Sequence, residues 1–141
     1  MVTDELEELL TEAYKHLKHG RFRMALTAAS KVYKQSPDNY KAAMCLARAT
    51  LENGAPARAL QLANIAVEIS NDDVNSYLYR GYLLMRMSIF DGALSDLDYA
   101  ILRKPDLLSW AFLNKARTLA GLGRFFEALE EIEKANESDS E

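Results

Sequence analysis

Two histidines, one cysteine and one glycine-containing segment are the residues of this chain best suited to chemistry. His16 and His19 lie three residues apart, but no acid occurs between residues 13 and 36 to complete a metal-binding set with them. Cys45 has no histidine near it in the sequence, which favours an inert, half-buried thiol over a reactive one. The GLGR segment at residues 121–124 resembles a phosphate loop superficially and fits a turn between helices better. We therefore predict no catalytic residue, no metal ligand and no cofactor site, and we do not expect an enzyme.

The length and composition of the chain favour one globular domain over residues 1–141. Its residues are 49% hydrophobic and 27% charged, which supplies enough apolar side chain for a core without disulfides. The formal net charge of −4 argues against nucleic acid as a partner. The acidic start and the lack of any run of about 18 apolar residues argue against a secretory signal and against direct membrane insertion. With a single cysteine, the expected compartment is the cytoplasm.

Small residues recur in this sequence at a nearly fixed period of about 34 residues. One set is Ala25, Ala59, Ala93 and Ala128, of which the last is displaced by a single inserted residue. A second set precedes these alanines by a constant interval, at Ala13, Ala47, Gly81 and Ala116. Turn residues keep the same period, at Gly20, Gly54, Ser88 and Gly123. Such a period indicates stacked helical hairpins, in which small residues let the paired helices approach closely.

Apolar residues recur at three- and four-residue spacing on both sides of each turn, which predicts two helices per period. The expected helices span residues 4–18, 21–35, 38–52, 55–69, 73–87, 89–103, 107–121 and 124–137. Asp38 follows Pro37 as the expected N-cap of the third helix, and Pro56 fits the first turn of the fourth.

This period, together with segments such as GRFRMAL, FDGALSDLDYAILRKPD and GRFFEALEEIEKA, resembles the tetratricopeptide repeat. The resemblance covers the chain as four units, at about residues 6–39, 40–73, 74–107 and 109–141. It implies an all-α, right-handed α-solenoid of helix-turn-helix repeats that binds other proteins. Asn71 departs from the pattern, because a proline is usual at that place.

The two ends of the repeat array are expected to be polar. The final helix carries one apolar stripe of Phe126, Leu129 and Ile132 among many charged residues, and the first helix is polar along its length. We therefore expect both ends to act as caps and the array to be complete with four units. The stretch 13–36 is basic and the residues from Glu127 onward are acidic. These charges are either solvated helix faces or the ends of a head-to-tail contact, with a second copy or with a partner.

The resemblance implies that the first helix of each repeat lines a concave groove for a protein or peptide partner. Eight residues in these helices are predicted to make contact, because Tyr, Trp, Met and Arg are enriched at interfaces. They are Tyr14, Met44, Arg48, Tyr79, Tyr82, Met85, Trp110 and Arg117. The leucines of the same helices are assigned instead to seams between repeats, at Leu10, Leu17, Leu51, Leu78 and Leu113.

We therefore expect a protein–protein interaction scaffold that binds an apolar or amphipathic segment of a partner. The alternative is a dedicated chaperone that shields a hydrophobic stretch of a secreted or membrane-bound client. One subgroup of the family holds acidic peptides with a clamp of basic and amide side chains. The clamp places fall here on Leu10, Tyr14, Cys45, Asn75 and Tyr79, none of which is basic, so a carboxylate-clamp co-chaperone is not expected.

Overall fold

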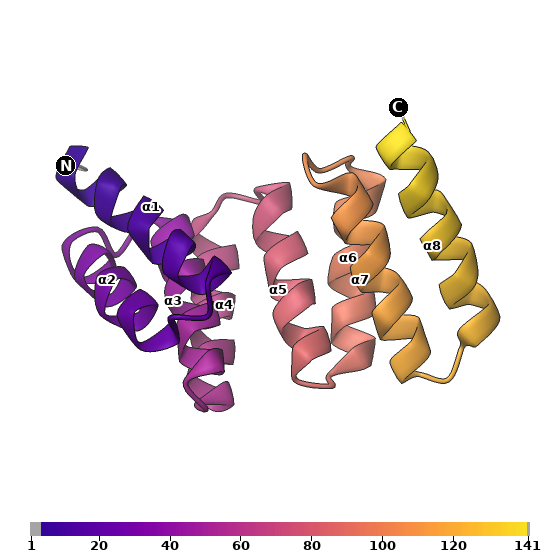
Figure 1. The fold of residues 1–141 in the computed structure, drawn as a ribbon, viewed down its shortest axis with the longest axis horizontal. Helices are drawn as coiled ribbons and strands as arrows, with labels where there is room; N and C mark the ends of the chain where they lie inside the picture. Colours follow the sequence, from indigo (N-terminus) through magenta and orange to yellow (C-terminus); the bar gives the residue numbers. More distant parts are fainter. Residues whose placement is uncertain (1–3, 141) are drawn as a thin grey trace. The chain divides into compact units, whose positions relative to one another are not determined.

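The computed structural model describes residues 4–140 of the chain, and this part is built from α-helices without a strand. The eight helices, drawn in Figure 1, are α1 (Asp4–Lys18), α2 (Phe22–Gln35), α3 (Tyr40–Glu52), α4 (Pro56–Ile69), α5 (Val74–Arg86), α6 (Phe90–Leu102), α7 (Leu108–Gly121) and α8 (Phe125–Ser140). The all-α prediction is confirmed. Each expected helix is present, and its ends differ by at most three residues from the expected ones.

Short turns join the two helices of each repeat, at the place where the sequence predicts them. Gly20, Gly54 and Gly123 have φ angles of 75°, 89° and 78°. This left-handed region favours glycine because glycine lacks a Cβ atom. In the third repeat the same place is taken by Ser88, which adopts a φ angle of 61°. The residue at this place therefore has a left-handed backbone conformation in all four repeats, although only three of them have glycine there.

The N-cap of α3 is Asn39, so the expectation of Asp38 is wrong by one residue. The Oδ1 atom of Asn39 accepts hydrogen bonds from the backbone N–H groups of Lys41 and Ala42, at 3.0 and 3.3 Å. The backbone N–H of Asn39 itself donates to the Ser36 carbonyl at 3.0 Å. Residues 36–39 thus form a turn around Pro37, and this turn delays the start of the helix.

The helices fall into two compact units, the first ending at Asn71 and the second beginning at Asp72. The boundary lies two residues before the junction between the second and third predicted repeats. Asn71, which stands where proline is usual, has a φ angle of 53°, and Asp72 has a φ angle of 63°. Asp73 then caps α5 by accepting a hydrogen bond from the Asn75 N–H at 2.8 Å. One domain over residues 1–141 remains a prediction.

Small residues fill the contact between the two helices of each repeat. All eight predicted positions are buried, namely Ala13, Ala25, Ala47, Ala59, Gly81, Ala93, Ala116 and Ala128. Gly81 is the extreme case, because a Cβ atom built on it would lie 2.9 Å from Cγ of Leu97. Leu97 is itself fixed in a buried cluster with Leu78, Ala100 and Ala111. The close approach of α5 and α6 therefore depends on the missing side chain at position 81.

We expect Gly81→Ala to lower the free energy of unfolding by about 1 kcal/mol, because the added methyl group overpacks a filled core. Overpacking costs roughly 1–3 kcal/mol, and the higher helix propensity of alanine returns only about 1 kcal/mol of that cost. Urea unfolding followed by circular dichroism measures the difference.

Gly92→Ala in α6 is the matched control. A Cβ atom there would lie 3.4 Å from Leu84 Cδ1 and 3.5 Å from Ile89 Cγ2, which is ordinary contact. This variant should raise the free energy of unfolding by up to about 1 kcal/mol. If both variants stabilise the protein equally, the packing constraint assigned to Gly81 is absent.

Candidate protein-interaction site

Cys45 and His16 each lie in surroundings that do not suit catalysis or metal binding. Cys45 is buried in α3, and burial raises the pKa of its thiol to about 12, although the charge of Arg48 acts in the opposite direction. A thiol that stays protonated and covered is a poor nucleophile. Arg21 Nε donates a hydrogen bond to His16 Nδ1 at 2.9 Å, next to the turn after α1. Among residues 4–140 no three His, Cys, Asp or Glu side chains are placed to hold a metal ion.

The GLGR segment is the turn that follows α7, as the sequence predicts. The backbone N–H of Gly123 donates to the Ala120 carbonyl at 3.0 Å, and that of Arg124 donates to the Leu119 carbonyl at 2.8 Å. These N–H groups close the last turn of the helix, so they are not available to hold a phosphate.

In the second unit, α5 and α7 bring three of the predicted contact residues together. Tyr79 and Tyr82 share one side of α5 because they are three residues apart. The ring of Trp110, from the first turn of α7, lies 5.0 Å from the ring of Tyr82 and 5.8 Å from that of Tyr79, measured between centroids. All three side chains are partly exposed. This cluster, called the α5–α7 aromatic face, is the main candidate site.

Arginines border the α5–α7 aromatic face. Arg86 Nη1 donates a hydrogen bond to the Tyr82 hydroxyl at 2.9 Å, and its guanidinium carbon lies 5.8 Å from the centre of that ring. Arg117 is exposed and donates to Asn114 Oδ1 at 3.3 Å, while Asn114 Nδ2 donates to the Trp110 carbonyl at 2.9 Å. The face thus combines apolar rings with positive charge. Met85, one turn along α5 from Tyr82, is half-buried.

In the first unit, one predicted contact residue connects two helices and another is buried. The hydroxyl of Tyr14 in α1 donates to the backbone carbonyl of Lys41 in α3 at 3.2 Å, and the side chain of Tyr14 is half-buried. Arg48 is also half-buried. Met44 is only 4% exposed, so the prediction that it makes a surface contact is wrong. It occupies the place in its repeat that Leu78 occupies one period later, and Leu78, which the sequence assigns to a seam, is buried.

One place in the repeat accounts for four of the predicted contact residues. Tyr14, Arg48, Tyr82 and Arg117 follow one another at successive periods of the sequence. None of them is buried. Tyrosine and arginine therefore alternate at the same position of the four first helices, and alignment of the repeats is the signal that reveals this pattern.

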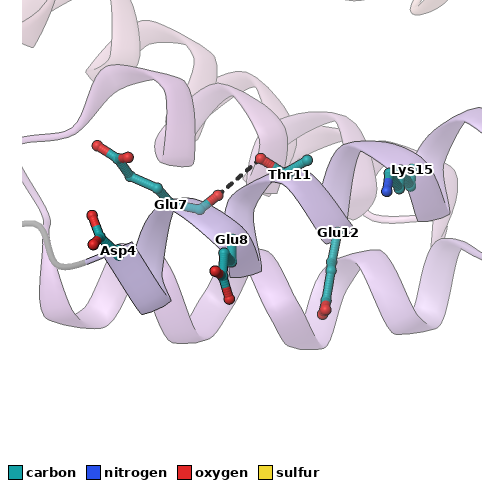
Figure 2. A pocket seen from close by; sticks show the side chains of 6 residues that line it. All are labelled: Asp4, Glu7, Glu8, Thr11, Glu12 and Lys15. Carbon is teal, nitrogen blue, oxygen red and sulfur yellow. Dashed lines mark hydrogen bonds between the residues drawn. The ribbon is translucent and has the colours of Figure 1, made fainter.

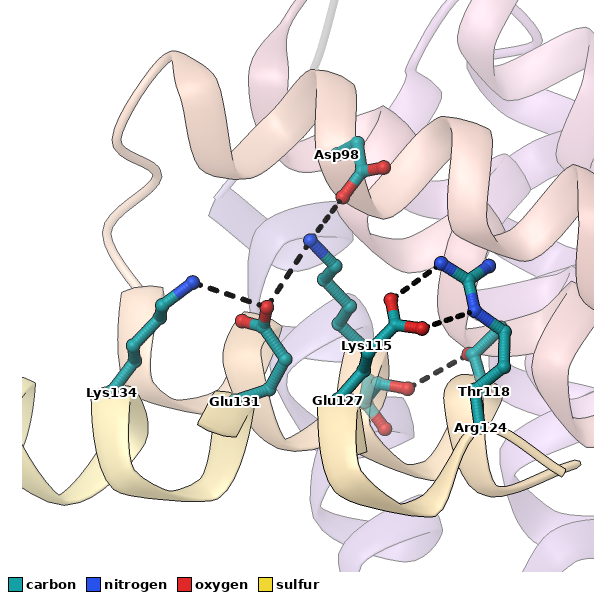
Figure 3. Close-up of polar contacts among 8 residues, drawn as sticks. Asp98, Lys115, Thr118, Arg124, Glu127, Glu131 and Lys134 are labelled. Atoms are coloured by element: carbon teal, nitrogen blue, oxygen red, sulfur yellow. Dashed lines mark hydrogen bonds and ion pairs between the residues drawn. The ribbon is translucent and has the colours of Figure 1, made fainter. Parts of the chain in front are cut away.

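Ion pairs between helices of the second unit were not predicted from the sequence. Arg80 in α5 donates to both carboxylate oxygens of Asp96 in α6, at 2.6 and 2.8 Å, and the Asp96 side chain is 8% exposed. Figure 3 shows the corresponding cation of α7, Lys115, whose Nζ lies 2.8 Å from Asp98 and 3.3 Å from Glu131. The signal was present in the sequence, because cation and acid have the same separation in both repeats and the two pairs lie one period apart.

The apolar stripe of α8 points away from the packed side of the helix. Phe126 is 86% exposed, Leu129 58% and Ile132 38%. The helix was expected to cap the array with a polar outer face, and the structure shows an exposed apolar stripe on it instead. The helix is seated through small residues such as Ala128 and Ala135, and through Glu131, which contacts Lys115 and Lys134. Glu131 is itself buried, although it is charged.

Comparison with known proteins places this arrangement of helices among helical-repeat structures. The family model for the tetratricopeptide repeat matches residues 10–74. TTC0263, a thermophilic TPR protein of Thermus thermophilus, aligns over 95% of this chain and 74% of its own, with 23% identity and a TM-score of 0.84. A crystal structure of MamA aligns over 96% of this chain and 78% of its own, with 20% identity and a TM-score of 0.73. At such identities the likeness shows the fold, an α-solenoid of helical hairpins. No curated protein matches the sequence significantly.

The helices carry no sign of a membrane span. Within residues 4–140, none of them is both long and apolar enough to cross a lipid bilayer.

We expect Arg80→Leu to lower the free energy of unfolding by about 2 kcal/mol or more, because it leaves the nearly buried Asp96 carboxylate without its cation. The double variant Arg80→Leu/Asp96→Leu should recover most of that loss. The first unit already holds leucines at the two equivalent places, Leu46 and Leu62, and both are buried. A double-mutant cycle in urea measures the coupling, and additive losses would contradict this account.

Proposed function

We propose that this chain, a member of the tetratricopeptide-repeat family, is a protein–protein interaction scaffold that binds a partner through its first helices. In this family those helices line a concave groove, and the occupant proposed here is an apolar or amphipathic segment. The observation that carries the proposal is the α5–α7 aromatic face, where Tyr79, Tyr82 and Trp110 are grouped and remain partly exposed.

Such a face suits recognition because of what its rings offer. Tyr and Trp present a large, stiff apolar area together with one polar atom, and they dominate the binding energy of known interfaces. The Trp110 ring packs against both tyrosine rings, so little side-chain entropy remains to be lost when a partner covers them. A partner segment laid across α5 and α7 would bury apolar area against all three.

The arginines beside the rings favour an amphipathic segment over a purely hydrophobic one. Arg86 and Arg117 are exposed, and Arg86 contacts the Tyr82 ring. An acidic group next to the apolar stripe of a partner would complement them. This charge supports a scaffold over a dedicated chaperone for hydrophobic client segments. A carboxylate clamp is not proposed, since Cys45 is buried and Tyr79 is not a basic residue.

We expect Tyr82→Ala to weaken partner binding by roughly 30-fold, equivalent to about 2 kcal/mol, because it truncates a ring at the centre of the contact. Proteins retained by the immobilised wild-type chain from native lysate are identified by mass spectrometry, and their affinities for the variants are then measured. Lys41→Ala is the control, since Lys41 is exposed on a first helix and is not one of the residues of this face, so its loss should cost under about 1 kcal/mol.

Trp110→Ala should weaken binding as Tyr82→Ala does, and it needs a separate stability control. Trp110 packs against the buried cluster of Leu78, Leu97, Ala100 and Ala111, so its truncation also lowers the melting temperature. Trp110 is the single tryptophan of the chain, and its fluorescence in the wild-type protein reports occupancy of the face. Normal binding by both ring variants would mean that the partner uses another surface.

A further inference from the structure

A second apolar surface lies on α8, separate from the α5–α7 aromatic face. Phe126, Leu129 and Ile132 follow one another at three-residue spacing and form an exposed stripe. Glu130, Glu133 and Glu137 continue the line of Phe126 along the helix at alternating four- and three-residue steps. The three glutamates are exposed, so an acidic edge borders the apolar stripe.

The helix α6 shows what covers this surface in the preceding repeat. Leu129 and Ile132 of α8 correspond to Leu94 and Leu97 of α6, each one period earlier. Leu94 packs against a buried cluster that includes Ala116 and Leu119 of α7. Leu97 shares a buried cluster with Ala111 of α7. This side of α6 therefore packs against α7, the first helix of the next repeat. The equivalent side of α8 is the exposed apolar stripe.

The electrostatics of that contact are also visible in α6. Asp98 of α6 forms an ion pair with Lys115 of α7 at 2.8 Å (Figure 3). The residue of α8 that corresponds to Asp98 is Glu133, again one period later. Consider a helix that packs on α8 in the way that α7 packs on α6. Its residue equivalent to Lys115 would lie next to Glu133. A lysine or arginine there completes the contact, and an acid opposes it.

A second copy of this chain does not meet that requirement. The helix that would stack on α8 in a head-to-tail contact is α1, in which Glu12 takes the place of Lys115, three repeats earlier. Figure 2 shows an open hollow along α1 that is lined by Asp4, Glu7, Glu8, Thr11, Glu12 and Lys15. Most of these side chains are acids. The basic residues of the stretch 13–36 lie mostly beyond α1, so α1 would meet the acidic edge of α8 with like charge.

We propose that the exposed face of α8 is a docking surface for an amphipathic helix of a partner protein, which places an apolar stripe on Phe126, Leu129 and Ile132 and a basic residue against Glu133. This surface adds a second binding site to the proposed scaffold, separate from the α5–α7 aromatic face. Its partner segment would be basic, whereas the segment proposed for the α5–α7 aromatic face carries an acidic group. The charge of Glu133 selects the partner, and the apolar stripe supplies the contact area.

The test uses a fluorescently labelled peptide with the sequence of residues 107–121, held helical by a hydrocarbon staple, as a stand-in for the partner helix. Its binding to the full chain is measured by anisotropy, beside a second peptide that carries Lys115→Glu. The lysine peptide should bind about fivefold or more tightly than the glutamate peptide. In the protein variant Glu133→Lys the preference should reverse.

Two further protein variants separate this surface from the α5–α7 aromatic face. Leu129→Ser should remove binding of the lysine peptide without loss of fold, since Leu129 is exposed, and Tyr82→Ala should leave that binding unchanged. The proposal is overturned if the lysine peptide does not bind, if Leu129→Ser binds it normally, or if the two peptides bind equally to both Glu133 forms. It is also overturned if sedimentation shows a dimer that Leu129→Ser dissociates, because the occupant would then be a second copy.

Discussion

The close approach of paired helices is the constraint on which the rest of this structure depends. Alanine or glycine recurs at two places in every repeat, and each of these residues is buried. At Gly81 even a methyl group would press on Leu97. Because these two places in each repeat hold only small side chains, the larger apolar and aromatic residues occupy other places on each helix. Some of them are buried, as Leu97 is, and others are exposed, as Phe126 is.

This division of helix sides explains where the candidate surfaces lie. In the second unit, Leu78 and Leu97 pack into the interior, while Tyr82 and Trp110 project from α5 and α7 and contact each other. On α8 the small side is seated through Ala128, and the large side chains such as Phe126 face outward. A helical-repeat chain can thus carry candidate binding surfaces without disrupting its core, because these large side chains are at least partly exposed while the small residues remain buried.

The helices are predictable from the sequence because a nearly fixed period constrains all four repeats at once. Their ends agree within three residues, and the turn places agree even where Ser88 replaces glycine. The predictions that fail concern which side chains are buried by a neighbouring helix. The sequence predicts Met44 as a surface contact and the last helix as a polar cap, whereas Met44 is buried and the stripe from Phe126 to Ile132 is exposed. Hydrophobicity shows that a side chain favours removal from water, but it does not show whether a neighbouring helix is present to cover it.

Equivalent places in a repeat supply the information that hydrophobicity lacks. Met44 shares its place with Leu78, which is buried, and Tyr82 shares its place with three residues that are not. Likewise Arg80 with Asp96 and Lys115 with Glu131 are the same pair of places one period apart, and leucines occupy those places in the second repeat. A side chain that is exposed where the equivalent residues of other repeats are buried therefore indicates a surface that lacks the neighbouring helix found in those repeats. By this criterion α8 differs from α6 because no helix packs on its apolar stripe. The negative charge of Glu133 favours a helix with a basic residue at that place.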